Sequence, residues 1–188
     1  AEHAIAMIVA GYRKLDRQIE SVKSGTWMDG VTRLPEGEFH TLAGKRAGIV
    51  GLGRIGSRVG KRLQGWECEV VYHDILQFPR EYEEAAHAGR VDLHTLLSTS
   101  DIVSLHVPLD PPTHHMISDK ELALMKRDAV LINTCRGPVV DEEALIRALR
   151  NKVIFGAGLD VVETEPIKPD NPLLRMDNVI ITPHVATR

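Results

Sequence analysis

Three polar residues follow apolar runs in the second half of the chain, and their types suit one kind of reaction. Arg136 follows the run L-I-N-T-C, Glu165 follows G-L-D-V-V-E-T, and His184 follows V-I-I-T-P. A guanidinium that never deprotonates can hold an anion and polarise a carbonyl. An imidazole that titrates near neutrality can exchange the proton that appears on the carbonyl oxygen, and a neighbouring carboxylate raises its pKa and fixes its orientation. The set suits interconversion of a 2-oxo acid and a 2-hydroxy acid.

Each of these residues also has a purely structural interpretation. An arginine behind a strand commonly forms a surface salt bridge, a histidine behind a proline commonly lies in a solvated loop, and Glu165 belongs to the acidic run E-T-E-P. Cys135 is most simply a small residue packed beneath the site, because it has no base of its own nearby. The nine histidines show no metal-binding spacing, so no metal site is expected.

A glycine-rich turn earlier in the chain predicts a dinucleotide site. The apolar run A-G-I-V leads into Gly51-x-Gly53-x-x-Gly56, and a helix-forming stretch follows. Gly51 permits a tight turn, Gly53 leaves room for a pyrophosphate, and Gly56 lets the helix pack close to the strand. Asp74 lies at the end of a second apolar run, where a carboxylate binds the adenine ribose. That carboxylate repels a 2′-phosphate and so favours NAD over NADP.

The rest of the chain alternates between strand and helix patterns. Strands are expected at residues 47–50, 69–72, 102–107, 129–133, within 155–161 and at 179–182, and helices at 54–64, 80–88, 93–98, 119–125 and 142–150. The strand runs are continuously apolar, as in a parallel sheet covered on both faces. The prediction is a doubly wound α/β fold whose carboxyl-end rim gathers the strand-end residues beside the nicotinamide. That arrangement suits hydride transfer between NAD and C2 of a 2-oxo acid.

Residues 1–17 read as a helix that is apolar nearly all round. Such a helix has neighbours on two sides, either its own domain plus a second subunit or further domain, or a single domain that surrounds it. Residues 21–45 read as a connecting loop with Trp27 and Phe39 as anchors.

Composition excludes several classes of protein. A net charge of −3 gives no reason to expect nucleic-acid binding, and no apolar run approaches the length of a membrane span. Two cysteines cannot build a disulfide framework, which favours a reducing compartment such as the cytoplasm.

Several long motifs, in order, make the chain similar to the D-isomer-specific 2-hydroxyacid dehydrogenase family. They are A-E-H-A-I-A-M, G-L-G-R-I-G, H-V-P-L with Thr113 following, L-I-N-T-C-R-G-P-V-V-D-E, G-A-G-L-D-V-V-E-T-E-P and N-V-I-I-T-P-H-V-A. The resemblance implies that Arg136, Glu165 and His184 are the catalytic residues. It implies a nucleotide site formed by Gly51, Gly53, Arg54, Ile55, Gly56, Asp74, Val107, Pro108, Thr113, Thr134, Cys135, Arg136, Asp160 and His184.

The resemblance also implies an organisation in two domains and a homodimer built through the nucleotide-binding domains. Residues 1–188 are expected to be the dinucleotide-binding domain, with an interdomain and dimerisation helix at 1–24 and a Rossmann core at 46–184. The substrate domain is expected to be absent from these residues, so they should bind NAD but show little turnover by themselves. A cysteine at position 135, where many relatives have serine or alanine, is a departure with a steric consequence only.

Two rival functions remain open at this stage. Corepressors of the same fold sense NAD(H) and retain the catalytic triplet, so the sequence does not separate them from enzymes. A relative acting on formate carries glutamine where Glu165 stands, which argues against that reaction, whereas phosphite remains possible.

Overall fold

The structure, a computed structural model, describes residues 1–27 and 40–186, and its centre is one parallel sheet of seven strands. The strands are β1 (Arg46–Val50), β2 (Glu69–His73), β3 (Ala88–Arg90), β4 (Ile102–Leu105), β5 (Val130–Asn133), β6 (Gly156–Leu159) and β7 (Val179–Ile181). Their order is β3-β2-β1-β4-β5-β6-β7, and every neighbouring pair is parallel. The predicted doubly wound α/β fold is confirmed.

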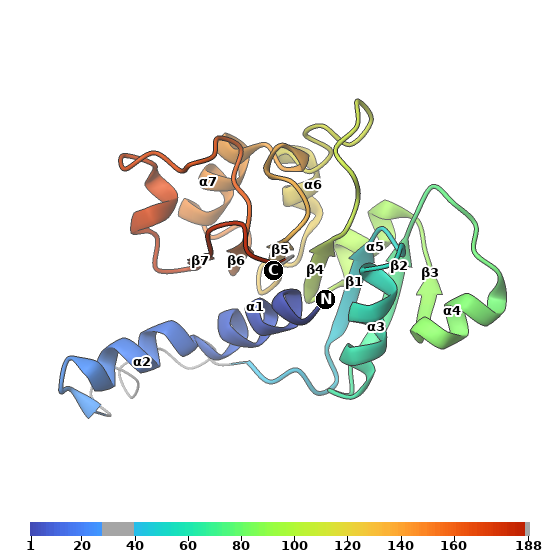
Figure 1. The fold of residues 1–188 in the computed structure, drawn as a ribbon, viewed down its shortest axis with the longest axis horizontal. Helices are drawn as coiled ribbons and strands as arrows, with labels where there is room; N and C mark the ends of the chain where they lie inside the picture. Colours follow the sequence, from blue (N-terminus) through green and yellow to red (C-terminus); the bar gives the residue numbers. More distant parts are fainter. Residues whose placement is uncertain (28–39, 187–188) are drawn as a thin grey trace.

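Helices cover both faces of the sheet (Figure 1). The helices α1 (Glu2–Arg13), α3 (Gly56–Gln64) and α4 (Arg80–Ala86) share one buried apolar cluster with the sheet. The helices α5 (Leu93–Thr99), α6 (Asp119–Leu124) and α7 (Glu142–Arg150) share the other. Strand residues alternate between the two clusters, with Ile49 in the first and Val50 in the second. Two buried faces explain why the strand runs are continuously apolar.

The N-terminal region differs from the single helix expected at residues 1–17. It forms α1 and then α2 (Leu15–Lys23), which meet at Lys14 in the left-handed conformation with φ of 50°. Helix α1 packs against the sheet through four buried side chains, whereas α2 extends away from the body (Figure 1). Trp27, expected as an anchor, is 71% exposed, and Phe39 lies outside the described residues.

Strand β3 was not predicted, and only its first residue, Ala88, falls within the helix expected over residues 80–88. Helix α4 ends at Ala86, His87 turns the chain with φ of 53°, and Ala88–Arg90 then pairs with β2. Only Ala88 of these three strand residues is buried, so a three-residue edge strand gives almost no apolar pattern. The remaining boundaries differ by at most two residues: α3 begins at Gly56 instead of residue 54, β4 ends at Leu105 instead of residue 107, and α7 has the expected bounds.

The direction in which strands are added changes between β1 and β4. After β1 the sheet grows on one side through β2 and β3, and from β4 it grows on the other side through β5, β6 and β7. Doubly wound sheets bind ligands in the crevice at this reversal, outside the carboxyl ends of the strands. The glycine turn follows β1 and Val107 follows β4, so both lie at that crevice.

Candidate active site

The three glycines of the turn after β1 each occupy a different kind of position. Gly51 has φ of 93°, and a β-carbon there would lie 2.8 Å from the carbonyl oxygen of His106. A β-carbon on Gly56 would lie 2.0 Å from the carbonyl oxygen of Gly51, so the helix needs glycine to approach the strand. At Gly53, by contrast, no atom lies within 4 Å of a built β-carbon. A side chain at Gly51 or Gly56 would therefore clash with backbone atoms, whereas the space beside Gly53 is free.

The carboxylate of Asp74 is fixed beside this turn. Its Oδ2 accepts a hydrogen bond from the amide of Leu52 at 2.8 Å, and its Oδ1 accepts from the amide of Leu76 at 2.9 Å. Each oxygen keeps a second lone pair for a further donor, such as a sugar hydroxyl. Among the described residues, no hydrogen bond occupies the amides of Arg54 and Ile55, which precede the N-terminus of α3. Free amides at a helix N-terminus suit a phosphate.

The loop after β4 forms the opposite wall of the crevice. The Cγ1 atom of Val107 would lie 3.0 Å from a β-carbon on Gly51, so the two segments are in contact. Pro108 is exposed, and the hydroxyl of Thr113 lies 2.7 Å from the Pro108 carbonyl oxygen. That hydroxyl also accepts from the amide of Asp110 at 2.8 Å, so Thr113 ties the loop to itself.

Asn133, at the end of β5, shapes the turn that carries Arg136. Asn133 is 1% exposed; its Oδ1 accepts from the Cys135 amide at 3.1 Å, and its Nδ2 donates to the Arg136 carbonyl at 2.9 Å. Thr134 and Cys135 are half-buried, and burial raises the pKa of the Cys135 thiol, which disfavours the nucleophilic thiolate. The Arg136 side chain is exposed at the rim, where it donates to the Cys135 carbonyl at 2.6 Å.

His184 and Glu165 form a hydrogen-bonded pair. The Nδ1 atom of His184 lies 2.7 Å from Oε2 of Glu165, and both side chains are a little over one third exposed. The other carboxylate oxygen of Glu165 accepts from the Val162 amide at 3.2 Å. His184 adopts φ of 54°, a conformation uncommon outside glycine and enriched at functional sites.

Asp160 holds the segment on which His184 lies. Its carboxylate is 1% exposed and accepts from the hydroxyl of Thr182, the amide of Val185 at 3.0 Å and the amide of Ala186 at 2.7 Å. Burial alone would raise the pKa of Asp160, but these hydrogen bonds and the nearby imidazole of His3 lower it overall. The carboxylate is therefore charged and serves as an anchor for the loop after β7.

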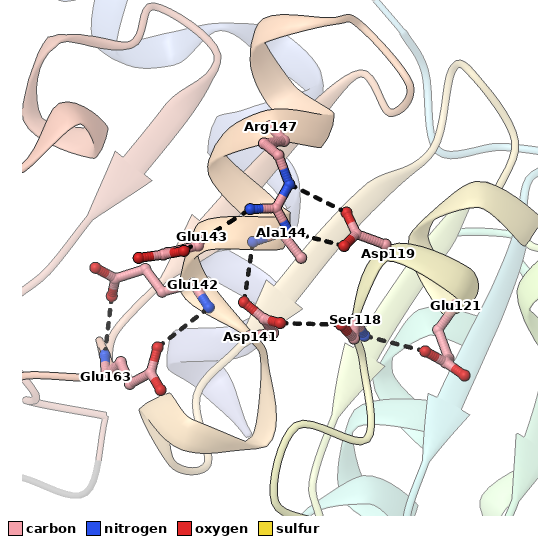
Figure 2. Close-up of polar contacts among 9 residues, drawn as sticks. All are labelled: Ser118, Asp119, Glu121, Asp141, Glu142, Glu143, Ala144, Arg147 and Glu163. Atoms are coloured by element: carbon pink, nitrogen blue, oxygen red, sulfur yellow. Dashed lines mark hydrogen bonds and ion pairs between the residues drawn. The ribbon is translucent and has the colours of Figure 1, made fainter.

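The turn of Arg136 and the loop of Glu165 are packed against each other. A β-carbon on Gly137 would lie 1.9 Å from the carbonyl oxygen of Val162, so this contact is between backbones. The amide of Glu163 donates to Glu142 Oε2 at 2.9 Å, and the amide of Glu142 donates to Glu163 Oε2 at 3.2 Å (Figure 2). The loop is thereby fixed to the first turn of α7.

The structure thus brings His184, Glu165 and Asp160 into one cluster, with the backbone of the Arg136 turn against it. Among the described residues, no hydrogen bond joins the Arg136 guanidinium to His184 or Glu165. Sequence reasoning missed Asn133 and Glu163. A buried-strand pattern that ends in asparagine was a usable signal for Asn133. Glu163 resembled solvated charge, and only the fold shows its partners.

A hollow of about 540 Å³ opens beside the histidine and glutamate. Its walls are mostly apolar, and they include Pro166, Ile167, Leu174 and Ile181. In the part of the chain that the structure describes, no group of three or more histidine, cysteine, aspartate or glutamate residues could hold a metal ion. Within the same residues no helix has the length and apolar character needed to cross a membrane.

Comparison with known proteins identifies a family and sets the extent of the match. The family model described as "D-isomer specific 2-hydroxyacid dehydrogenase, NAD binding domain" matches residues 5–186. A glyoxylate reductase of Korarchaeum cryptofilum is 43% identical over 188 residues, which are all of this chain and 56% of the relative. The chain thus spans about half the length of the curated relatives it matches.

Solved structures of similar proteins share the fold. A glyoxylate reductase from Paecilomyes thermophila superposes with a TM-score of 0.90 at 34% identity, covering 99% of this chain and 54% of that one. The NAD-complexed form of a D-isomer specific 2-hydroxyacid dehydrogenase from Lactobacillus delbrueckii ssp. bulgaricus gives 0.83 at 31% identity, covering 97% and 57%.

Proposed function

The chain belongs to the D-isomer specific 2-hydroxyacid dehydrogenase family, and on that premise we propose that the whole protein is an NAD-dependent dehydrogenase of small D-2-hydroxy acids. The observation that carries the proposal is the 2.7 Å pair of His184 and Glu165 at the same rim of the sheet as the open glycine turn. An acid–base residue and a dinucleotide site at one rim are the two requirements of the reaction.

In this proposal the polar side chains at the rim have distinct roles in the reaction. Arg136 binds the substrate carboxylate and polarises the carbonyl at C2, since its guanidinium stays charged and donates in a planar fork. His184 gives a proton to the oxygen at C2 during reduction and removes it during oxidation. Glu165 fixes the orientation of the imidazole through Nδ1, which leaves Nε2 for the substrate. Asp160 positions the loop that carries His184, and Asn133 positions the turn that carries Arg136.

The residues around the turn fit NAD. The space at Gly53 and the free amides of Arg54 and Ile55 suit a pyrophosphate, and the carboxylate of Asp74 suits the hydroxyls of an adenine ribose. When bound, the nicotinamide exchanges a hydride with C2 of the substrate. The remaining residues proposed to line the nucleotide are Gly51, Gly56, Val107, Pro108, Thr113, Thr134, Cys135, Arg136, Asp160 and His184.

The proposal extends to the organisation of the protein. Residues 46–184 are assigned to the Rossmann core and residues 1–24 to an interdomain and dimerisation region, with the substrate domain outside residues 1–188. Leu15, Ile19 and Val22 of α2 are 43%, 46% and 52% exposed and lie on one helix face, which supports a homodimer through this region. The two free cysteines support a cytoplasmic location.

An NADH-oxidation assay of the full-length protein tests the proposed activity. Glyoxylate, hydroxypyruvate, pyruvate and bulkier 2-oxo acids are the substrates to compare, and at least one should give saturable turnover. His184→Gln should reduce that turnover by about 10² to 10⁴. The alternative role of an NAD(H)-sensing corepressor predicts NADH binding without turnover of any 2-oxo acid, and that result would replace the enzymatic proposal. Residues 1–188 by themselves should bind NADH with little turnover.

A further inference from the structure

Arg90 lies beside the proposed ribose site although it is 16 residues beyond Asp74 in the sequence. It is the last residue of β3, and its register partner in β2 is Tyr72. The chain from Tyr72 continues through His73 to Asp74, so the carboxyl ends of both strands deliver their residues to one corner of the rim. There the Nη2 atom of Arg90 donates a hydrogen bond to the backbone carbonyl of Asp74 at 2.9 Å.

The guanidinium binds the carbonyl of Asp74 and leaves its carboxylate directed elsewhere. The two carboxylate oxygens accept from the amides of Leu52 and Leu76, so the carboxylate remains at the glycine turn. Among the described residues, no carboxylate lies within ion-pair distance of Arg90, whose side chain is exposed. An anion and an unneutralised cation are therefore held side by side at one corner.

We propose that Arg90 is the second determinant of dinucleotide selectivity in this protein, a cation whose attraction for a 2′-phosphate is masked by the carboxylate of Asp74. The inference rests on the dinucleotide site proposed above. A 2′-hydroxyl is served by Asp74 alone, because a carboxylate accepts its hydrogen bond. A 2′-phosphate is repelled by Asp74 and attracted by Arg90, whose planar fork matches phosphate oxygens. The balance between the two side chains sets the preference.

The same contact also suits a purely structural role, in which Arg90 only braces the backbone after β2. The two roles differ in what the substitution changes. A brace affects both dinucleotides equally, since it acts on the shape of the loop. A selectivity residue affects the phosphorylated dinucleotide alone, and its effect depends on residue 74.

A double-mutant cycle, measured as the binding of each dinucleotide, distinguishes the selectivity role of Arg90 from the bracing role. Dissociation constants of NADH and NADPH are measured by nicotinamide fluorescence for the wild type, Asp74→Asn, Arg90→Gln and the double variant. Asp74→Asn should tighten NADPH binding by at least about tenfold, as expected when a repelled phosphate gains a charge-assisted hydrogen bond. In the Arg90→Gln background the same substitution should gain less than about threefold. Arg90→Gln alone should leave the affinity for NADH within about twofold of wild type.

Two further variants serve as controls. Arg90→Lys keeps the charge and should preserve most of the NADPH gain of Asp74→Asn. Arg80→Gln removes an exposed arginine of α4 that pairs with Glu84 at 2.7 Å, and it should leave the gain unchanged.

Three outcomes would overturn the inference. An equal NADPH gain with and without Arg90 would remove its role, and equal weakening of both dinucleotides by Arg90→Gln would assign it to bracing. In both of these cases NADH binding by the wild type leaves the proposed function standing. Failure of the wild type to bind either dinucleotide would instead reject the cofactor site itself, and this inference with it.

Discussion

His115 and Glu163 are joined at 2.6 Å between Nε2 and Oε1, and this contact links three segments of the rim. The amide of His115 donates to the carbonyl of Pro138 at 2.8 Å, within the short helix that follows Arg136. Glu163 lies two residues before Glu165 and is also bonded to Glu142 of α7. Together these contacts fix the loop after β4, the turn that carries Arg136 and the loop that carries Glu165 to one another.

The first prediction concerns Glu163. Glu163→Ala should lower the free energy of unfolding by about 1–3 kcal/mol, because it leaves the amide of Glu142 and the ring of His115 without their acceptor. It should also lower kcat, because Glu165 loses its fixed loop. Urea denaturation and NADH-oxidation kinetics measure the two effects.

Glu143→Ala is the matched control for that experiment. Glu143 lies on α7 next to Glu142, but its side chain is 89% exposed and its nearest contact with Arg147 is 3.8 Å long (Figure 2). Exposed pairs of this kind contribute little to stability. Equal losses in the two variants would show that Glu163 has no special part in the rim.

The second prediction concerns the proposed proton donor. His184→Gln should reduce kcat for 2-oxo acid reduction by about 10² to 10⁴, the usual contribution of a positioned acid–base residue. Glu165→Gln should reduce it less, because the imidazole remains and loses only its partner. Both variants should bind NADH as the wild type does, by fluorescence titration. A His184→Gln protein with full activity would transfer the role to another residue.

The sheet could be predicted from the sequence because each central strand is a continuous apolar run within one short segment. Five apolar runs bounded by turns sufficed for the central strands, and the glycine turn predicted a cofactor site beside them. Strand β3 escaped because Ala88–Arg90 has one buried residue and no periodicity. That omission also concealed Arg90, because a neighbouring strand brings it to Asp74 from 16 residues further along the chain.

The residues of the candidate site also fall into those that the sequence identifies and those that only the fold reveals. Arg136, Glu165 and His184 were recognisable from motifs, and the structure adds the 2.7 Å contact between the last two. The supporting residues depend on contacts between segments far apart in the chain, as between Asp160 and the amide of Ala186. No pattern within one segment carries that information. The break between α1 and α2 at Lys14 was also not predictable, because a residue in the left-handed conformation within a helical pattern has no apolar signature.

The third prediction is a loss of stability in mild acid through His106. Burial lowers the pKa of His106 to about 3, and its Nε2 lies 2.9 Å from the hydroxyl of Ser104. An unfolded chain protonates this histidine below pH about 6.5. Between these two values the unfolded state binds more protons, so falling pH favours unfolding. From the unfolded pKa down to pH 5 the contribution is about 2 kcal/mol.

Urea denaturation at pH 7.5 and at pH 5.0 measures this effect. His106→Gln should lose less stability between the two pH values than the wild type does, by about the same 2 kcal/mol. His94→Gln, at an exposed position on α5, is the control and should keep the wild-type difference. Identical pH dependence in all three proteins would mean that His106 becomes protonated in the folded state.

The last prediction concerns the apolar stripe of α2. Leu15, Ile19 and Val22 recur at spacings of four and three residues, so they share one face of the helix, and all three are exposed. Burial of such side chains in a second copy of the chain would contribute about 1.5–3 kcal/mol each if it were complete. Ile19→Glu would place a charge in that contact and should weaken self-association at least about a hundredfold. Glu20→Lys, away from the stripe on the same helix, should leave it unchanged. Sedimentation velocity over a range of concentrations tests both variants, and a wild-type protein that is monomeric throughout would contradict the dimer.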